Sequence, residues 1–482
     1  MSITPQAFYV HLQQLAGVEK YLIAYSGGID SHVLLHLCAR LKNSPGGFKQ
    51  SFSAVYIDHG LSSHAKQWGI HCQQICFSLD IPLTLIEVDA QSKNGQSPEA
   101  AARTARYQAF KQLLTTKECL LTAQHLDDQA ETLMLQLLRG SGTRGLAAMP
   151  KVKSFARGLL ARPMLAYRKQ HIIDYARIHQ LDWIEDESNH QQCIDRNYLR
   201  HTIFPLLAKR WPAVAESFAK SAENLSEAQM LQDEMAAADI QPVFNVLDDG
   251  TIEYDKILLD PLVELLTDHD NRPDHSERTF HYKNARLNNI LRYWINLNNY
   301  PLPSKKILAQ IVENLILARQ DAMPVVCWRR DQLACELRRY QHKLYLLKID
   351  SEYKKTRNSI AFTEQLIENK VNSYSVSLMP SSSDTMRSSF PRKTLLSKKL
   401  TIAYRQGGER FRKRQDEQSH LLKHWFQQQA IPPWERDCMP LIFWGDELIQ
   451  IGNTRLNYSL NSGEKKLNHD DSLIIRWQSG KN

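Results

Sequence analysis

Residues 26–31 bring together two hydroxyls, two adjacent glycines and a carboxylate, a combination suited to binding a charged ligand. The residues before them, Tyr21–Tyr25, are apolar and aromatic, as in a buried parallel strand, and apolar residues recur at helical spacing from Val33 to Leu41. A strand therefore turns directly into a helix, where backbone N–H groups, hydroxyls and the positive end of the helix dipole can hold phosphate oxygens. The predicted nucleotide-binding residues are Ser26, Gly27, Gly28, Ile29, Asp30 and Ser31.

The carboxylate in this turn needs a physical reason, because Asp30 would repel phosphate oxygens. A Mg2+ ion between the carboxylate and the phosphates removes the conflict, since hard oxygen ligands suit that ion. We therefore predict that Asp30 is a metal ligand and a catalytic residue. The alternative is an ordinary Gly-Gly turn at a strand–helix junction. The turn has neither the Gly-Lys-Ser/Thr of a Walker loop nor the spaced glycines of a dinucleotide fingerprint.

A second acidic group, Asp127, Asp128 and Glu131, opens a predicted helix that runs from Asp127 to about Leu138. One carboxylate is enough to cap a helix, but this turn has three. Asp128 and Glu131 fall on one helix face, and two neighbouring carboxylates repel each other unless a cation lies between them. We predict that both are catalytic and that they bind either a metal ion or a substrate ammonium group.

Two arginines, Arg103 and Arg106, are three residues apart on a predicted helix and share one of its faces. Such a pair is usually solvated on a surface helix. Here mostly alanines precede the pair, so the helix packs closely and gives the guanidinium groups definite directions. We predict that both arginines are catalytic and bind phosphate or substrate through their forked donors.

The first half of the chain alternates strands with helices, which is typical of an α/β fold. We predict a parallel sheet with helices on both faces and with ligands at the carboxyl ends of its strands. The further elements expected are a strand near 53–58, a helix to about Leu79, a strand at 83–88, a helix from Pro98 to about Leu114 and a strand near 119–123.

The second half differs in pattern and suggests further domains. We predict a nucleotide-binding catalytic domain at 1–214, a helical middle domain with a small β element at 215–350, a linker at 351–389 and a small α+β C-terminal domain at 390–482. Basic residues from Lys393 to Arg414 flank the Gly407-Gly408 turn and would suit RNA backbone phosphates, although most charge runs are solvated faces.

Composition sets broad limits on the protein. Its 482 residues, 43% hydrophobic and 23% charged, fit about three globular domains. The eight cysteines have irregular spacing, so neither a disulfide framework nor a zinc site is expected. We expect no membrane segment and a cytoplasmic location. The net charge of +8 permits a nucleic-acid partner, and a homodimer is left open.

The turn at 26–31 resembles the SGGxDS loop of the PP-loop pyrophosphatases (adenine-nucleotide hydrolase-like fold), which split ATP between the α and β phosphates. Further blocks narrow the resemblance to the tRNA(Ile)-lysidine synthetase family. They are Glu99-Ala-Ala-Ala-Arg103-x-x-Arg106-Tyr107, His125-x-Asp127-Asp128-Gln-Ala-Glu131-Thr132, Arg139-Gly-Ser-Gly142, Trp183-Ile-Glu-Asp186, Arg196-Asn197 and Arg200, and 431–445 near the end. Gln124 departs from the second histidine often found there.

The resemblance implies ligation of free L-lysine to C2 of the wobble cytidine of CAU-anticodon tRNA(Ile), with ATP and Mg2+. The cytosine O2 would first attack the α phosphorus of ATP and release pyrophosphate, and lysine would then displace AMP. Residues 26–31 would hold pyrophosphate, and Asp128 and Glu131 would recognise the lysine amine. Another PP-loop tRNA-modifying enzyme, such as a thiolase, and an inert tRNA-binding protein are the alternatives.

Overall fold

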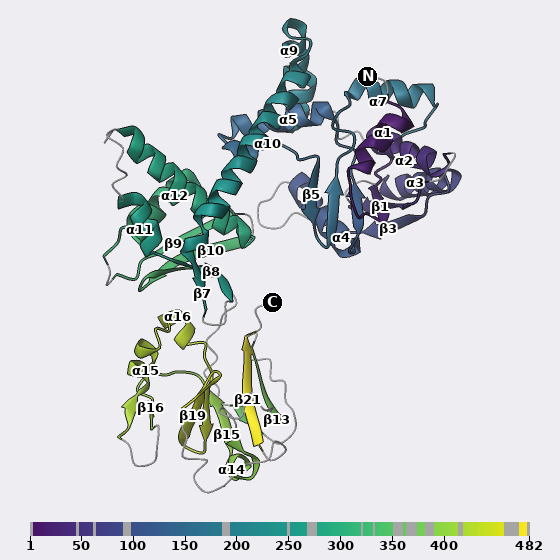
Figure 1. The fold of residues 1–482 in the computed structure, drawn as a ribbon. Coiled ribbons are helices and arrows are strands. Elements are labelled where there is room, and N and C mark those ends of the chain that lie inside the picture. The colour runs from purple at the N-terminus through teal and green to yellow at the C-terminus, as the bar shows by residue number, and fades with distance from the viewer. Residues whose placement is uncertain are drawn as a thin grey trace. The chain divides into compact units, whose positions relative to one another are not determined.

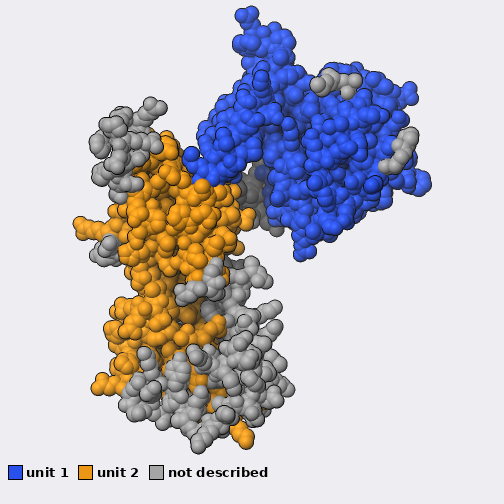
Figure 2. Space-filling model, viewed as in Figure 1, with its two compact units in different colours: residues 1–235 blue, residues 236–482 orange. Residues whose placement is uncertain are grey.

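The computed structural model divides the chain into two compact units, residues 1–235 and 236–482 (Figure 2). The described residues are 3–44, 48–60, 64–89, 98–185, 193–247, 251–267, 277–319, 322–330, 333–349, 360–362, 374–380, 390–412, 418–456 and 472–479.

The first unit is built on a six-stranded sheet whose order is β3-β2-β1-β4-β6-β5 (Figure 1). Five strands run parallel, and only β5 runs antiparallel to its neighbour β6. The strands are β1 Lys20–Ala24, β2 Ser51–Asp58, β3 Leu83–Glu87, β4 Glu118–Leu121, β5 Val152–Phe155 and β6 Gly158–Ala161. The predicted parallel sheet is confirmed, whereas the β5–β6 hairpin was not predicted.

Helices follow the strands in the predicted alternation. They are α1 Pro5–Gln13, α2 Ile29–Lys42, α3 Ala65–Ser78, α4 Pro98–Leu113, α5 Leu126–Leu138, α6 Thr143–Leu146, α7 Lys169–Ile178, α8 Asp195–Tyr198, a π turn at Leu199–Ile203, α9 Phe204–Arg210 and α10 Val214–Asp239. Neighbouring residues of β1 pack in different hydrophobic cores, because side chains alternate between the two faces of a strand. Ile23 packs in the core that contains α2 and α7 residues, while Leu22 packs with Phe110 of α4. The sheet is therefore covered on both faces, as expected.

Strand β1 lies between β2 and β4, so the chain builds the sheet outward from β1 in two directions. Ligands of open α/β sheets bind beside the carboxyl ends of strands where the order reverses in this way. The segments after β1 and after β4 therefore lie at the expected binding position. They carry Asp30, Asp128 and Glu131, three of the five residues that the sequence predicts to be catalytic.

The second unit begins with a five-stranded antiparallel sheet in the order β7-β8-β11-β10-β9. Its strands are β7 Phe244–Val246, β8 Ile252–Leu258, β9 Val325–Arg330, β10 Leu333–Tyr340 and β11 Lys343–Lys348, and its helices are α11 Asp260–Thr267, α12 Glu277–Leu297, α13 Lys305–Ile311 and a π turn at Val312–Ile316. The region predicted as helical is thus an α+β domain. Its short strands have weaker periodicity than its helices, which explains the underestimate.

The end of the chain forms small sheets, in agreement with the predicted α+β C-terminal domain. The strands are β12 Ile360–Phe362, β13 Tyr374–Pro380, β14 Phe390–Pro391, β15 Leu400–Ala403, β16 Arg410–Phe411, β17 His420–Leu421, β18 Leu441–Trp444, β19 Glu447–Ile451, β20 Thr454–Arg455 and β21 Ser472–Ser479, and the helices are α14 Arg392–Leu396, α15 Leu422–Gln428 and α16 Pro433–Arg436. Gly407 and Gly408 have φ of 103° and 87°, so the predicted turn needs glycine.

Two of these strands correct the predicted linker at 351–389. Strand β12 pairs with β15, and β13 pairs with β21. The serine-rich composition suggested a linker, but serine alternates with apolar residues from 374 to 378, and this period of two is typical of a strand.

Lys413, Arg414 and Asp186, which the sequence analysis singled out, lie outside the described residues. Among the described helices, none combines the length and apolar character that crossing a membrane requires.

His36 of α2 is partly buried where this helix contacts α7. The Nδ1 atom of His36 lies 3.0 Å from the Tyr175 hydroxyl, and its ring centroid is 5.0 Å from that of His179. Burial, and after it the nearby His179 and Arg40, lower the pKa of His36 to about 4. The folded chain therefore binds a proton at His36 less readily than the unfolded chain does.

We expect the free energy of unfolding to fall as the pH drops from about 6.5 to 4, because only the unfolded chain takes up the proton there. Allowing for partial exposure, His36 contributes roughly 1–2 kcal/mol to this loss. His36→Gln should flatten the pH dependence of the urea midpoint between pH 7.5 and 4.5. The exposed His64 provides a matched control, and an equal slope in His36→Gln and His64→Gln would contradict the assignment.

Candidate active site

The turn after β1 forms a cradle of backbone and hydroxyl groups. The Ser26 N–H donates to Ser31 Oγ at 3.2 Å, and Ser31 Oγ donates to the Gly28 carbonyl at 2.9 Å. Gly27 has a φ of 81°, and a Cβ atom there would lie 2.5 Å from Ile184 Cδ1, so this position requires glycine. Gly28 caps α2 without a side-chain hydrogen bond. The first turn of α2 therefore presents backbone N–H groups that no capping side chain occupies, which suits phosphate.

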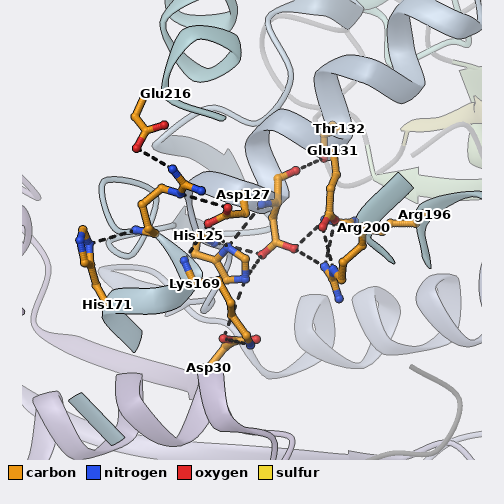
Figure 3. Close-up of polar contacts among 12 residues, drawn as sticks. Asp30, His125, Asp127, Glu131, Thr132, Lys169, His171, Arg196, Arg200 and Glu216 are labelled. Atoms are coloured by element: carbon orange, nitrogen blue, oxygen red, sulfur yellow. Dashed lines mark hydrogen bonds and ion pairs between the residues drawn. The ribbon is translucent and has the colours of Figure 1, made fainter. Parts of the chain in front are cut away.

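Asp30 faces this cradle and is partly exposed. Its Oδ1 atom lies 2.5 Å from Lys169 Nζ at the start of α7 and 3.9 Å from His125 Nε2 (Figure 3). The carboxylate is thus held by a cation in this structure, as expected of a negative charge near a phosphate site. A single carboxylate beside phosphate oxygens fits Mg2+, which commonly takes one or two carboxylates together with substrate phosphates.

His125 connects Asp30 to the acidic group on α5. It is the N-cap of α5, and its Nδ1 accepts a hydrogen bond from the Asp128 N–H at 3.3 Å. The Asp128 Oδ2 atom in turn accepts from the His125 N–H at 3.1 Å and lies 3.3 Å from His125 Nε2. The His125 Nε2 atom therefore lies within 4 Å of both the Asp30 and the Asp128 carboxylates. His125 thus joins the two predicted catalytic segments into one site.

Asp128 and Glu131 lie side by side, as predicted, and two arginines neutralise them (Figure 3). Arg196 donates to Glu131 at 2.7 Å and to Asp128 at 2.9 Å. Arg200 donates to the same two carboxylates at 2.7 and 3.0 Å. The Glu131 side chain is only 3% exposed, so this pairing offsets a large desolvation cost.

The charges of the cluster shift each other's titration. Burial alone would raise the pKa of Asp128, but His125, Arg196 and Arg200 outweigh it and hold this pKa below its usual value. Burial would likewise lower the pKa of Arg200, but hydrogen bonding and the charge of Glu131 raise it above the ordinary range. Both groups therefore remain ionised at neutral pH.

A π turn orients the two arginines. The Phe204 N–H donates to the Leu199 carbonyl, five residues earlier, within the helical segment 195–210. Pro205 has no N–H to continue the ordinary helical pattern, which explains the irregularity at this point. Arg196 and Arg200 remain four residues apart and reach the same pair of carboxylates.

Asp127 has a different role from its neighbours. It accepts hydrogen bonds from the Lys169 N–H at 2.7 Å and from Arg168 Nε at 3.1 Å, and Arg168 also donates to Glu216 of α10 at 2.6 Å. Asp127 therefore fixes the start of α7, and with it Lys169. Asp127 thus has partners separate from the arginines that pair with Asp128 and Glu131.

The two predicted arginines of α4 have different described neighbours. Arg106 lies close enough to His59, after β2, for its charge to add to burial in lowering the pKa of that histidine. Arg103 is exposed, and its guanidinium lies 5.0 Å from the ring centroid of Tyr107. Asp30, Asp128 and Glu131 thus share one hydrogen-bonded and ionic network, whereas the contacts described for Arg103 and Arg106 lie elsewhere.

Three groups of this site were not assigned a role from the sequence: Lys169, His125 and the arginine pair. Arg196 and Arg200 carry a signal, because two buried carboxylates require positive charge and arginines four residues apart share a helix face. Lys169 carries no comparable signal, since its position opposite Asp30 depends on how α7 packs against α2.

We expect Arg200→Met to destabilise the first unit by roughly 2 kcal/mol, because Glu131 keeps only Arg196 as a partner. The double variant Glu131→Gln/Arg200→Met should lose less stability than the sum of the two single variants. Urea unfolding measures both effects, with the exposed Arg210→Met as the control. Additive losses would contradict the coupling.

Family models match three parts of the chain. A PP-loop domain matches residues 4–207, a TilS substrate binding domain matches 281–345 and a TilS substrate C-terminal domain matches 400–469. A relative from Coxiella burnetii, "tRNA(Ile)-lysidine synthase", is 37% identical over 455 residues, which cover 93% of this chain and 92% of the relative. Proteins of the same name from Escherichia coli O157:H7 and Methylococcus capsulatus are 37% and 34% identical over 91% and 95% of this chain and over 92% and 96% of their own lengths.

Proposed function

The chain belongs to the tRNA(Ile)-lysidine synthase family, a family of ligases, and from this premise we propose how its residues form lysidine on tRNA(Ile) with ATP. The full proposal is the ligation of free L-lysine to C2 of the wobble cytidine of a CAU-anticodon tRNA(Ile). A single observation supports this use of the site. Through His125, the phosphate cradle after β1 and the acidic pair on α5 form one network.

In the first step, the cytosine O2 attacks the α phosphorus of ATP and pyrophosphate leaves. The backbone N–H groups at the start of α2, together with Ser26 and Ser31, hold the phosphates of the leaving group. Lys169 neutralises Asp30, which would otherwise repel the incoming nucleotide. Mg2+ held by Asp30 would supply further neutralisation of phosphate charge. Arg106 and Arg103 bind phosphate of the adenylate or of the RNA next to it.

In the second step, the lysine ε-amine attacks C2 and AMP leaves with the O2 atom. The free amine is protonated at neutral pH, since its pKa is about 10.4. Asp128 and Glu131 recognise the ammonium group, and one of them accepts its proton as the C–N bond forms. Both already accept hydrogen bonds from Arg196 and Arg200, so lysine binding requires these guanidinium groups to share their partners.

A second role for the acidic pair follows from the same contacts. Asp128 and Glu131 would instead hold Arg196 and Arg200 in place, and the arginines would bind an anionic group, either the adenylate phosphate or the lysine carboxylate. The two roles predict different defects when Glu131 is changed.

The family assignment does not favour a thiolase or an inert tRNA-binding protein. ATP and tRNA as substrates suggest that the reaction takes place in the cytoplasm.

The function is tested directly by incubating the protein with ATP, labelled L-lysine and a tRNA(Ile) transcript that has a CAU anticodon. We expect label in the RNA, together with AMP and pyrophosphate in equal amounts. A transcript with uridine at the wobble position is the control, because its C4 carbonyl replaces the amino group of cytosine. Absence of lysine from the CAU transcript would refute the proposal.

Glu131→Gln should retain AMP transfer to tRNA but slow lysine addition by about 100-fold or more, because the proton acceptor is lost. The measurement is accumulation of adenylated tRNA from labelled ATP, in parallel with lysine incorporation. Glu223→Gln, an exposed glutamate on α10, is the matched control. Loss of AMP transfer itself would refute lysine recognition by Glu131 and would favour the role of the acidic pair in holding the arginines.

A further inference from the structure

Basic side chains gather at the β5–β6 end of the first unit's sheet, away from the acidic network. Lys153 is on β5, Arg162 directly follows β6, and Arg103 is on α4. Lys153 pairs in register with Leu160, one residue before the end of β6. Strand β6 runs parallel to β4, so its carboxyl end lies on the same edge of the sheet as the catalytic segments. The three basic residues therefore belong to the edge that carries the active site.

Two aromatic rings hold these charges close together. The Arg103 guanidinium lies 5.0 Å from the Tyr107 ring centroid, and the Lys153 Nζ atom lies 5.9 Å from the Phe155 ring centroid. The Tyr107 and Phe155 rings meet edge to face with their centroids 5.8 Å apart. Arg103 and Lys153 are both exposed and flank this aromatic pair. The two cationic side chains therefore lie against one aromatic pair.

The cluster concentrates positive charge around a buried guanidinium group. Arg162 is only 5% exposed, and its Nη1 atom donates to the Pro150 carbonyl at 2.7 Å, but its buried Nε atom has no hydrogen-bond partner within the described part of the chain. Partial burial, followed by the positive charges of Arg162, Arg103 and Lys111, lowers the pKa of Lys153. Converging cations of this kind reduce stability unless they meet an anion.

We propose that Arg103 and Lys153 bind backbone phosphates of the RNA substrate beside the nucleotide that reacts, with the buried Arg162 adding positive charge behind them. This inference rests on the proposed function and assigns to Arg103 the RNA rather than the adenylate. The phosphates of ATP belong to the cradle after β1. Strands β6 and β5 lie two and three strands from β1, roughly 10 and 14 Å at about 4.8 Å per strand, within reach of a neighbouring nucleotide of the same RNA strand.

The test measures equilibrium binding of the CAU tRNA(Ile) transcript to the full chain across a range of salt concentrations, without ATP or lysine. Lys153→Gln and Arg103→Gln should each weaken binding by about 3- to 10-fold. Each should also reduce the slope of log K against log salt by about 0.7 to 0.9, the value for one lost phosphate contact. Both side chains are exposed, so the variants should fold, which circular dichroism checks.

Lys66→Gln is the matched control, because Lys66 is exposed on α3. This helix packs on β2 and β3, and β3 is the outer strand on the other side of the sheet from β5. ATP binding, measured separately, should stay within twofold of wild type in Lys153→Gln, because Lys153 is not among the residues assigned to the nucleotide. An unchanged tRNA slope, or an equal change in Lys66→Gln, would overturn the proposal. So would a loss of ATP binding in the absence of RNA.

Lysidine formation by the wild-type chain separates the two levels of inference. If the wild type modifies tRNA(Ile) and the variants bind it normally, the phosphate-binding cluster is refuted while the function stands. If the wild type neither binds nor modifies this tRNA, the proposed function fails first.

Discussion

The pairing of two buried carboxylates with two arginines is the interaction on which the site depends. Asp128 and Glu131 lie one helical turn apart at the start of α5, where their mutual repulsion and loss of hydration would oppose folding. Arg196 and Arg200 remove both costs and thereby attach the helical segment 195–210 to α5. These four residues thus also fix tertiary structure. Their charges balance, so the loss of one side chain would leave an unpaired charge in a largely buried site.

The order of the strands explains why the phosphate cradle and the acidic pair meet. Strands β1 and β4 are neighbours in the sheet although almost a hundred residues separate them in sequence. Each ends in a turn that starts a helix, so the N-termini of α2 and α5 lie at one edge. Positive helix ends favour the anionic groups placed there, which include Asp30 and Asp128. His125 completes the connection because it caps α5 and faces both carboxylates.

A second network holds the supports of the site. Arg168 connects Asp127 to Glu216 of α10, and further ion pairs join α10 to the same unit, Lys151 with Glu223 and Arg144 with Asp233. These pairs are partly exposed, so each contributes little free energy, but together they define where α10 lies on the first unit. Through Asp127 they also fix the start of α7, which carries Lys169 to Asp30.

Local patterns in the sequence determined the α/β fold of the first unit, the phosphate turn and the shared face of Asp128 and Glu131, because strand alternation, glycine chemistry and helical spacing depend only on nearby residues. The sequence predicted too few strands in the middle domain and none at 374–380, because these strands are short or rich in serine. Contacts between distant segments were decided only by the tertiary structure: Lys169 opposite Asp30, the arginines on the acidic pair, and Arg106 near His59. No local pattern encodes such contacts, because they depend on which elements pack together.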